Sequence, residues 1–401
     1  MTPVEDATST ERPIGFMPKL ADAESTARLT RAEEKKPGDG ELNTELLQQK
    51  GFGVYCWYTG KNNFTTADAS QVMLMQNQRV TYNGALWTYS PSKYWPLADD
   101  EKLTFRAYAP YVSYQLQTDT KGLPLLPVVV TKDDYHNGTQ HDPLWGTGKH
   151  DGTEDAHDAA DKNEVYGKLY DNYTYTMSGS LLAKDNRDGT IDWYFHHGMA
   201  SLMFTCSVIA DPGCDQVVIR SISVSPLYDM GLLDLSSPAT LLNDKPQKPA
   251  WADCSGDMTV ELTENDPNTT AGDLAESPVQ VTPDPLYTAY PFTIKTGTKS
   301  PDPTKPTDPA NLLKKGLLII PRDYSGSNPR MVVTVKYTID KESEEQTAIG
   351  YVTNTTFYGN TSYIVGLKLT PATRGLEIEI VQMAFTKWVD DISIEREIYN
   401  W

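Results

Sequence analysis

The hydrophobic and polar positions between Val80 and Tyr114 form two strand-like runs separated by an acidic turn at residues 99–101. The first run places apolar residues at Val80, Tyr82, Leu86, Trp87 and Tyr89, just before Ser90–Pro91. In the second run every other residue is apolar: Leu103, Phe105, Ala107 and Ala109. The intervening positions are Thr104, Arg106 and Tyr108. Because successive strand side chains point to opposite faces, this period predicts a half-buried β-strand.

Further strand-like runs recur along the whole chain, bounded by Gly, Pro, Asn and Asp. We predict strands at 13–17, 51–58, 180–183, 191–204, 217–224, 258–262, 290–294, 316–321, 331–337, 361–369, 376–385 and 392–401. Val217–Val224 is predicted to pair back onto the preceding run across the Pro212–Gly213 turn. The residues Val72–Met75 fit a short strand or a helical turn equally well. Many short strands with frequent turn signals predict an all-β protein built from sandwiches.

Length and a change in composition predict two domains. The chain has 401 residues, and single domains usually hold about 100–200. A mixed apolar and Pro-rich stretch between Pro226 and Pro249 separates two sets of alternating runs. We therefore predict an N-terminal strand with a charged tract over residues 1–50, a sandwich over 51–235 and a second sandwich over 236–401.

The charge balance narrows the range of partners. The chain has 54 acidic against 35 basic residues, a formal net charge of −19. Nucleic acid and anionic membranes would be repelled, so neither is expected as a partner. The sequence contains no run of 18 apolar residues that would predict a membrane helix. Its first residues hold no apolar secretion segment, so we expect a cytoplasmic protein or one whose targeting segment was removed.

Four cysteines are too few for a disulfide scaffold in a chain of this length. Cys206 and Cys214 flank a predicted turn, and the predicted pairing separates them by roughly 10 Å along the strand. That distance exceeds the reach of a disulfide. We expect free or buried thiols.

Two histidine clusters are the candidates for metal or catalytic chemistry. The polar segment 132–163 contains His136, His141, His150 and His157, the last three each followed by Asp. This segment is either a metal site or a solvated polar loop, and structural zinc sites usually have tighter spacing and cysteine ligands. His196–His197 lies in an apolar run without a nucleophile elbow or an H-E-x-x-H pattern, which indicates structural histidines. We therefore predict no catalysis and no cofactor.

Tryptophans offer a second kind of binding chemistry. A tryptophan in a strand either lines a sugar-binding face or packs in a core. The six concerned are Trp57, Trp87, Trp95, Trp145, Trp193 and Trp251. A carbohydrate-binding surface module is thus an alternative function, and a secreted β-rich hydrolase is a weaker one.

A resemblance to a known family rests on the order of several short motifs. The segment from Trp87 to Pro96, W-T-Y-S-P-S-K-Y-W-P, precedes L-T-F-R-A-Y-A-P-Y and later H-H-G-M-A. Together these resemble the fimbrillins, the pilin and pilus-tip subunits of Bacteroidales. The resemblance marks as core signature residues Trp95, Pro96, Phe105, His197 and Met199.

The resemblance implies two transthyretin-like Greek-key sandwiches, exported as a lipoprotein to the outer membrane. It also implies assembly into adhesive fimbriae with other subunits by strand exchange, and a possible host or bacterial surface ligand. Arg31, or Arg28 before it, corresponds to the site of an Arg-specific protease. Ile392, Ile394 and Ile398 share one face of a final strand, interrupted by Arg396. That strand is either the donor to a neighbouring subunit or an ordinary edge strand of its own domain.

Overall fold

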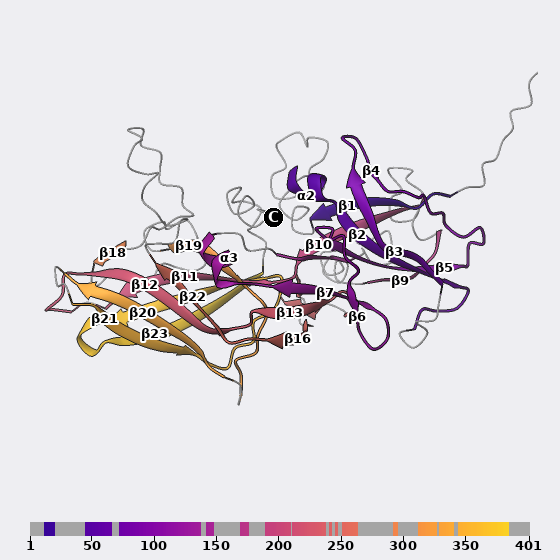
Figure 1. Cartoon of the computed structure of the whole chain (residues 1–401). Coiled ribbons are helices and arrows are strands. Elements are labelled where there is room, and N and C mark those ends of the chain that lie inside the picture. The colour runs from indigo at the N-terminus through magenta and orange to yellow at the C-terminus, as the bar shows by residue number, and fades with distance from the viewer. Residues whose placement is uncertain are drawn as a thin grey trace, which may run out of the picture. The chain divides into compact units, whose positions relative to one another are not determined.

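The computed structural model shows an almost entirely β protein. It describes residues 12–20, 45–65, 72–137, 142–147, 169–175, 189–209, 211–237, 240–242, 245–247, 251–263, 292–295, 312–326, 329–340 and 344–384. Within these ranges the helices are short: α2 (Glu45–Lys50), α3 (Lys132–Asn137) and the 3-10 turn η3 (Pro371–Thr373). The predicted all-β class is confirmed (Figure 1).

The chain divides into two compact units that are not consecutive in sequence. The first comprises Met1–Leu126, Pro143–His196 and Asp234–Pro246, and the second Pro127–Asp142, His197–Leu233 and Gln247–Trp401. This division differs from the predicted domains 51–235 and 236–401, because the second unit also takes residues from the middle of the chain. A change in composition can reveal a domain boundary when each domain is one continuous stretch of sequence. Here the chain passes between the two units several times, so a single Pro-rich stretch cannot mark the boundary.

The first unit is built on one sheet with strand order β1-β10-β8-β5-β2-β3-β4, and β9 also pairs with β5. The strands are β1 (Gly15–Leu20), β2 (Phe52–Gly60), β3 (Val72–Tyr82), β4 (Trp87–Thr88), β5 (Lys102–Ala109), β8 (Leu144–Thr147), β9 (Tyr170–Tyr173) and β10 (Thr190–His197). Central β2 and β5 pair antiparallel, with Cys56 opposite Phe105. The ambiguous segment Val72–Met75 is therefore part of a strand.

The alternating run at β5 is a strand, but the prediction that it is half-buried is wrong. From Leu103 to Ala109 every residue is buried. The side chain of Arg106 is covered by Asp171 and Ser236. Tyr108 lies close to Gly53, where a Cβ atom would come within 2.3 Å of its ring. The polar residues at alternate positions of this run predicted a face in contact with solvent. In the structure their polar groups are instead hydrogen-bonded within the protein.

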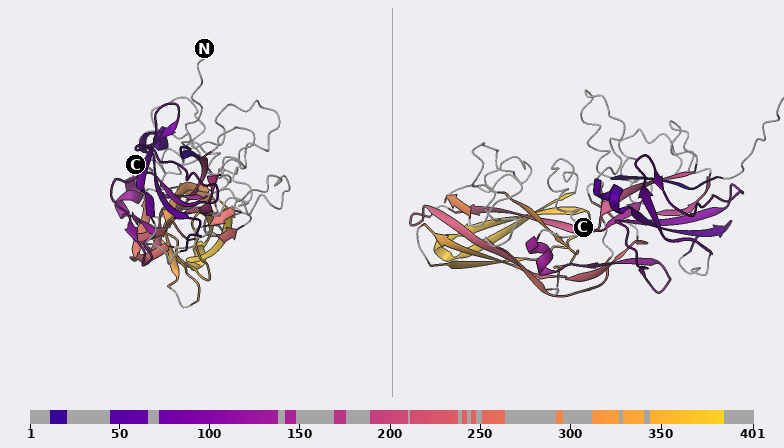
Figure 2. Two further views of the ribbon diagram at one scale, coloured as in Figure 1. Left: turned by 90° about the vertical axis from the view of Figure 1, so that its right-hand side faces the viewer. Right: turned by 45° about the horizontal axis from the view of Figure 1, so that its top comes forward.

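The second unit contains a larger sheet with strand order β17-β12-β20-β21-β23-β22-β11-β19, and β18 also pairs with β12. Its strands are β11 (Ala200–Val208), β12 (Gln216–Leu227), β17 (Met258–Thr263), β18 (Phe292–Lys295), β19 (Leu312–Ile319), β20 (Met331–Ile339), β21 (Gln346–Val352), β22 (Thr361–Thr370) and β23 (Gly375–Ala384). Among the described residues β21 pairs in parallel with β23 at a single position, Ile349 opposite Gly375. Figure 2 shows the strands of this unit from two further directions.

The predicted hairpin across Pro212–Gly213 is wrong. In the sheet order, β20, β21, β23 and β22 stand between β12 and β11. Strand β11 instead pairs in parallel with β22, with Leu202 opposite Tyr363, while β12 pairs with β20. A turn signal reports only that the chain reverses locally, whereas strand partners can come from any distance along the sequence, and each of these strands pairs with strands from later in the chain.

Short strands complete the two units. β6 (Gln117–Thr118) pairs with β7 (Pro124–Val129), and β13 (Met230–Asp234) pairs with β16 (Trp251–Ser255). β14 (Thr240–Leu242) and β15 (Lys245–Gln247) form a two-stranded sheet.

All four cysteines are free thiols, as predicted. Burial raises the pKa of Cys206 to about 12 and the pKa of Cys56 well above its usual range. A thiol reacts as its thiolate, so both groups stay protonated and inert near neutral pH.

Candidate functional site

The first strand of the chain lies at one end of the first unit's sheet. β1 pairs in parallel with β10, placing Gly15 opposite Thr190, Phe16 opposite Ile191 and Pro18 opposite Trp193. In the sheet order β10 is its single neighbour among the described strands. The predicted short strand at residues 13–17 is therefore real, and it is added to the edge of a core formed by residues far along the sequence.

The side chains of β1 and the residue before it fill an aromatic pocket. Ile14 is 2% exposed and Phe16 is 4% exposed. The Phe16 ring centroid lies 5.4 Å from that of Tyr89 and 6.3 Å from those of Phe52 and Phe105. Losing β1 would expose these rings and the free backbone groups of β10, so the vacated position would be an apolar groove beside an unpaired strand.

We call the segment Tyr89–Trp95, which begins at the end of the first strand-like run, the strap. It lies along residues 12–14. The amide of Ile14 donates to the carbonyl of Lys93 at 2.9 Å, and the amide of Trp95 donates to the carbonyl of Arg12 at 2.8 Å. The Tyr89 hydroxyl donates to the carbonyl of Ile14 at 2.9 Å. The strap thus pairs with residues 12–14, while β10 pairs with the residues that follow.

Trp95 joins the strap to the turn that precedes β10. Its indole Nε1 donates to the carbonyl of Gly189 at 2.9 Å, and the same carbonyl accepts the amide of Gly15 at 2.9 Å. Gly189 has a φ of +85°, and a Cβ atom there would lie 2.8 Å from the carbonyl oxygen of Pro13. Only glycine combines this backbone conformation with so close an approach.

The side chain of Arg12 contacts two residues outside the strap, Asp99 and Tyr175. Its Nη1 lies 2.6 Å from Oδ1 of Asp99, and its guanidinium carbon lies 4.2 Å from the centroid of the Tyr175 ring. The Arg12 side chain is 30% exposed. A carboxylate and an aromatic face both attract a cation, so this arrangement is a small cation-binding site occupied by the chain's own arginine.

Substituting Tyr89 by Phe should reveal how the strap holds the chain at high pH. Burial raises the pKa of Tyr89 to about 12, above the value near 10 of an unfolded tyrosine. The neutral hydroxyl therefore contributes stability that is complete below pH 10 and lost between pH 10 and about 12. We expect Tyr89→Phe to be less stable than the parent at pH 8, with the difference shrinking above pH 10 in urea unfolding. Tyr94→Phe, at a residue that is 42% exposed, is the control; a difference independent of pH would contradict the expectation.

His197 and Met199 lie just before β11 in the second unit, and both are hydrogen-bonded to Asp142. Oδ2 of Asp142 lies 2.5 Å from Nδ1 of His197, and Oδ1 accepts the amide of Met199 at 2.9 Å. Asn360 accepts the amide of His197 at 3.2 Å and donates its own amide to the Met199 carbonyl at 2.9 Å. Asp142 is fully buried. Asp142 therefore links the buried ring of His197 to the backbone just before β11, which is a structural role for this histidine.

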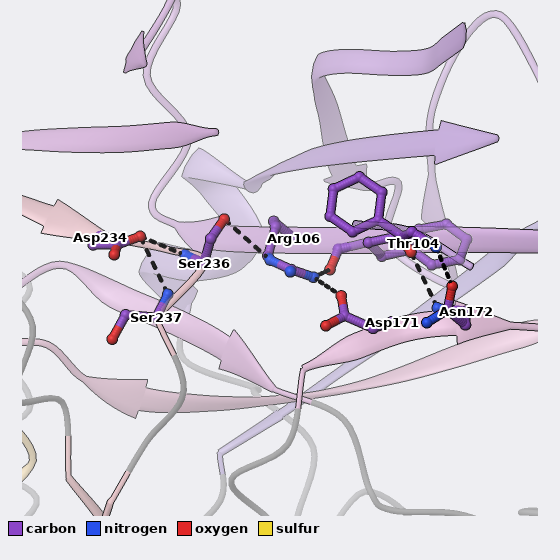
Figure 3. Close-up of polar contacts among 9 residues, drawn as sticks. Thr104, Arg106, Asp171, Asn172, Asp234, Ser236 and Ser237 are labelled. Carbon is purple, nitrogen blue, oxygen red and sulfur yellow. Dashed lines mark hydrogen bonds and ion pairs between the residues drawn. The ribbon is translucent and has the colours of Figure 1, made fainter. Parts of the chain in front are cut away.

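The buried side chain of Arg106 is the centre of a second polar cluster, in the first unit (Figure 3). Its Nη1 lies 2.7 Å from Oδ1 of Asp171 and its Nε donates to the Ser236 hydroxyl at 3.2 Å. The carboxylate of Asp234 accepts the amides of Ser236 and Ser237 at 2.8 and 3.2 Å. These contacts tie β5 to β9 and to the segment after β13. These contacts explain why the charged side chain of Arg106 can be buried, so no bound ligand is needed to explain it.

The remaining core signature residues belong to the strap or lie beside it. Trp95 and Phe105 are 2% and 0% exposed, with ring centroids 5.8 Å apart. Pro96, the residue after the strap, is half-buried. The sequence did not predict a site formed by Arg12, Asp99, Tyr175 and Gly189, because these residues come from segments far apart in the chain.

The six tryptophans within the described residues do not form an exposed platform. Trp57, Trp95, Trp145 and Trp193 are buried, and Trp87 and Trp251 are half-buried. Stacking against a sugar requires an accessible ring face. The arrangement therefore favours core packing over the sugar-binding face considered above.

Several predicted site residues lie outside the described residues. They are Arg28, Arg31, His141, His150, His157, Ile392, Ile394 and Ile398. For His136 the structure describes only the backbone, in α3. In the part of the chain that is described, no three His, Cys, Asp or Glu residues are placed to hold a metal ion. No described helix is long and apolar enough to cross a membrane.

Comparisons with known proteins agree with the resemblance found in the sequence. Fimbrium subunit Fim1C from Phocaeicola vulgatus is 31% identical over 91 residues, which are 22% of this chain and 24% of that protein. A crystal structure of a fimbrial protein from Bacteroides vulgatus superposes with a TM-score of 0.52 at 15% identity, covering 93% of this chain and 99% of the other. This chain has the fold of a fimbrial protein. No family model matches the sequence. The sequence match to Fim1C spans about a quarter of the length of that relative.

Proposed function

We propose that this protein is a structural subunit of cell-surface fimbriae with a role in adhesion, assembled with other subunits by exchange of its first strand. The observation that carries the proposal is the position of β1 at the end of the sheet. Its aromatic side chain is inserted among Phe52, Tyr89 and Phe105, and a parallel partner lies on one side. Such a strand can be replaced by a strand of another subunit that has the same apolar pattern. The fold shared with a fimbrial protein supports the same reading.

The proposal extends to maturation and location. β1 ends at Leu20, and the next described element, α2, begins at Glu45. Arg28 and Arg31 lie in the charged tract between these two elements. Cutting there would separate β1 covalently from the rest of the sheet. In this proposal the protein is exported as a lipoprotein of the outer membrane, its units are transthyretin-like sandwiches, and residues 389–401 supply the donor strand.

An Arg-specific protease should cut the folded protein at Arg31 or Arg28. Cleavage concentrates in exposed segments without regular structure, and the charged composition of this tract is typical of them. We expect mass spectrometry to show loss of the segment up to one of these arginines while circular dichroism stays that of a folded β protein. The double variant Arg28→Gln/Arg31→Gln should resist cutting there. Cutting elsewhere in the parent, with both arginines intact, would contradict the strand-exchange mechanism.

A further inference from the structure

We infer that the groove of the first strand selects its incoming strand by charge: it accepts a strand of another fimbrial subunit with Arg or Lys at the place now held by Arg12. This inference rests on the proposed strand exchange and specifies the partner. The basis is the site formed by Asp99 and Tyr175, which binds the Arg12 guanidinium at the beginning of the groove.

The pattern required of the partner follows from the contacts of residues 12–16. The cation lies two residues before Ile14, which is buried, and four before Phe16, which fills the aromatic pocket. Alternate residues of a strand face the same side, so the three positions form one continuous set. At the intervening Gly15 a Cβ atom would lie 2.8 Å from the hydroxyl of Thr190, which favours a small residue there. The partner strand is thus expected to run in the same direction as β1. It carries a basic residue at the position of Arg12, an aliphatic residue at that of Ile14 and a bulky apolar residue at that of Phe16.

Charge makes the first position selective. Without Arg12, Asp99 would face the incoming chain without its present partner, and an acidic residue there would be repelled. The carboxylate of Asp99 is 62% exposed, so each of its contacts is modest. An exposed ion pair and an exposed cation–π contact together amount to roughly a 5- to 20-fold preference for a cation over an alanine.

The chain's own C-terminal segment meets part of this pattern. Arg396 and Ile398 repeat the spacing of Arg12 and Ile14. In that register Asn400 takes the place of Phe16, and in the register that places Ile392 and Ile394 in the apolar positions, Asp390 would face Asp99. We therefore expect a strand with all three features to be preferred over a second copy of this chain.

The test uses the full chain with a site for a sequence-specific protease inserted between Thr30 and Arg31. After cleavage, labelled peptides of residues 10–22 compete for the groove, and gel filtration with mass spectrometry measures the bound peptide and the released N-terminal fragment. The Arg12→Ala peptide should bind about 5- to 20-fold more weakly than the parent peptide, and Arg12→Lys should retain most of the affinity. In the Asp99→Asn protein the difference between Arg and Ala peptides should fall below about 3-fold.

Asp100→Asn is the matched control. This neighbouring carboxylate pairs with Lys61 at 2.8 Å instead of Arg12, so its loss should leave the preference for arginine intact. Equal binding of the Arg and Ala peptides to the parent protein would overturn the cation site while leaving strand exchange in place. Failure of the parent peptide to displace the fragment at all would overturn strand exchange itself, and the selectivity inferred from it.

Discussion

Replacing Trp95 by Ala is expected to lower the free energy of unfolding by about 3–5 kcal/mol, the usual cost of truncating a buried aromatic side chain. Trp95 is 2% exposed, and its ring lies 5.8 Å from Phe105 and 6.2 Å from Tyr175 between centroids. The substitution also removes the hydrogen bond to Gly189 at the beginning of β1. Phe105→Ala, at a fully buried position in the same cluster, should cost a similar amount.

Guanidinium unfolding followed by tryptophan fluorescence measures this effect, since Trp57, Trp145 and Trp193 remain as probes in the first unit. Tyr94→Ala is the matched control. It removes the neighbouring aromatic ring of the strap, which is 42% exposed, and should change stability by less than about 1 kcal/mol. Trp95→Phe should lie between the two, because it retains a ring but not the indole donor. If Trp95→Ala cost less than about 1 kcal/mol, this residue would be a surface feature and an adhesive face would become the better reading.

Deleting residues 389–401 should leave a soluble, folded monomer that cannot polymerise after cleavage near Arg31. The last described strand, β23, ends at Ala384 and pairs with β22 along its whole length, so the deletion leaves this sheet intact. The strand predicted there from the sequence has an apolar stripe at Ile392, Ile394 and Ile398, which needs a groove in which to be buried. In the proposed mechanism that groove belongs to a neighbour that has lost its own β1.

Gel filtration and electron microscopy of the cleaved protein measure assembly, and circular dichroism measures folding. Ile394→Asp should block assembly, whereas Ser393→Asp, on the opposite face of the same strand, is the matched control and should not. Unfolding of the deletion variant would show that the segment belongs to its own domain as an edge strand. Normal polymers would show that another segment is the donor.

The two predictions address opposite ends of one exchange. The first measures how firmly the strap and its aromatic cluster hold the chain's own first strand. The second measures whether the last segment can take the corresponding place in a neighbour. If the first strand were held much more tightly than any donor, cleavage alone would not start assembly. The strength of the contacts at Arg12, Ile14 and Phe16 therefore sets the threshold for exchange.

Local pattern in the sequence determined the all-β class, most strand positions, the free thiols and the structural character of His197. These features depend on a period of two residues, on turn residues and on spacing along one strand, all of which are local. Only the tertiary structure decided that Arg106 is buried, that β11 and β12 are not neighbours in their sheet, and that the second unit takes strands from the middle of the chain. It alone placed Arg12 against Asp99 and Tyr175, which lie 87 and 163 residues further along. The reason is physical: strand pairing and charge pairing join residues of any sequence separation, whereas composition and alternation report only on near neighbours.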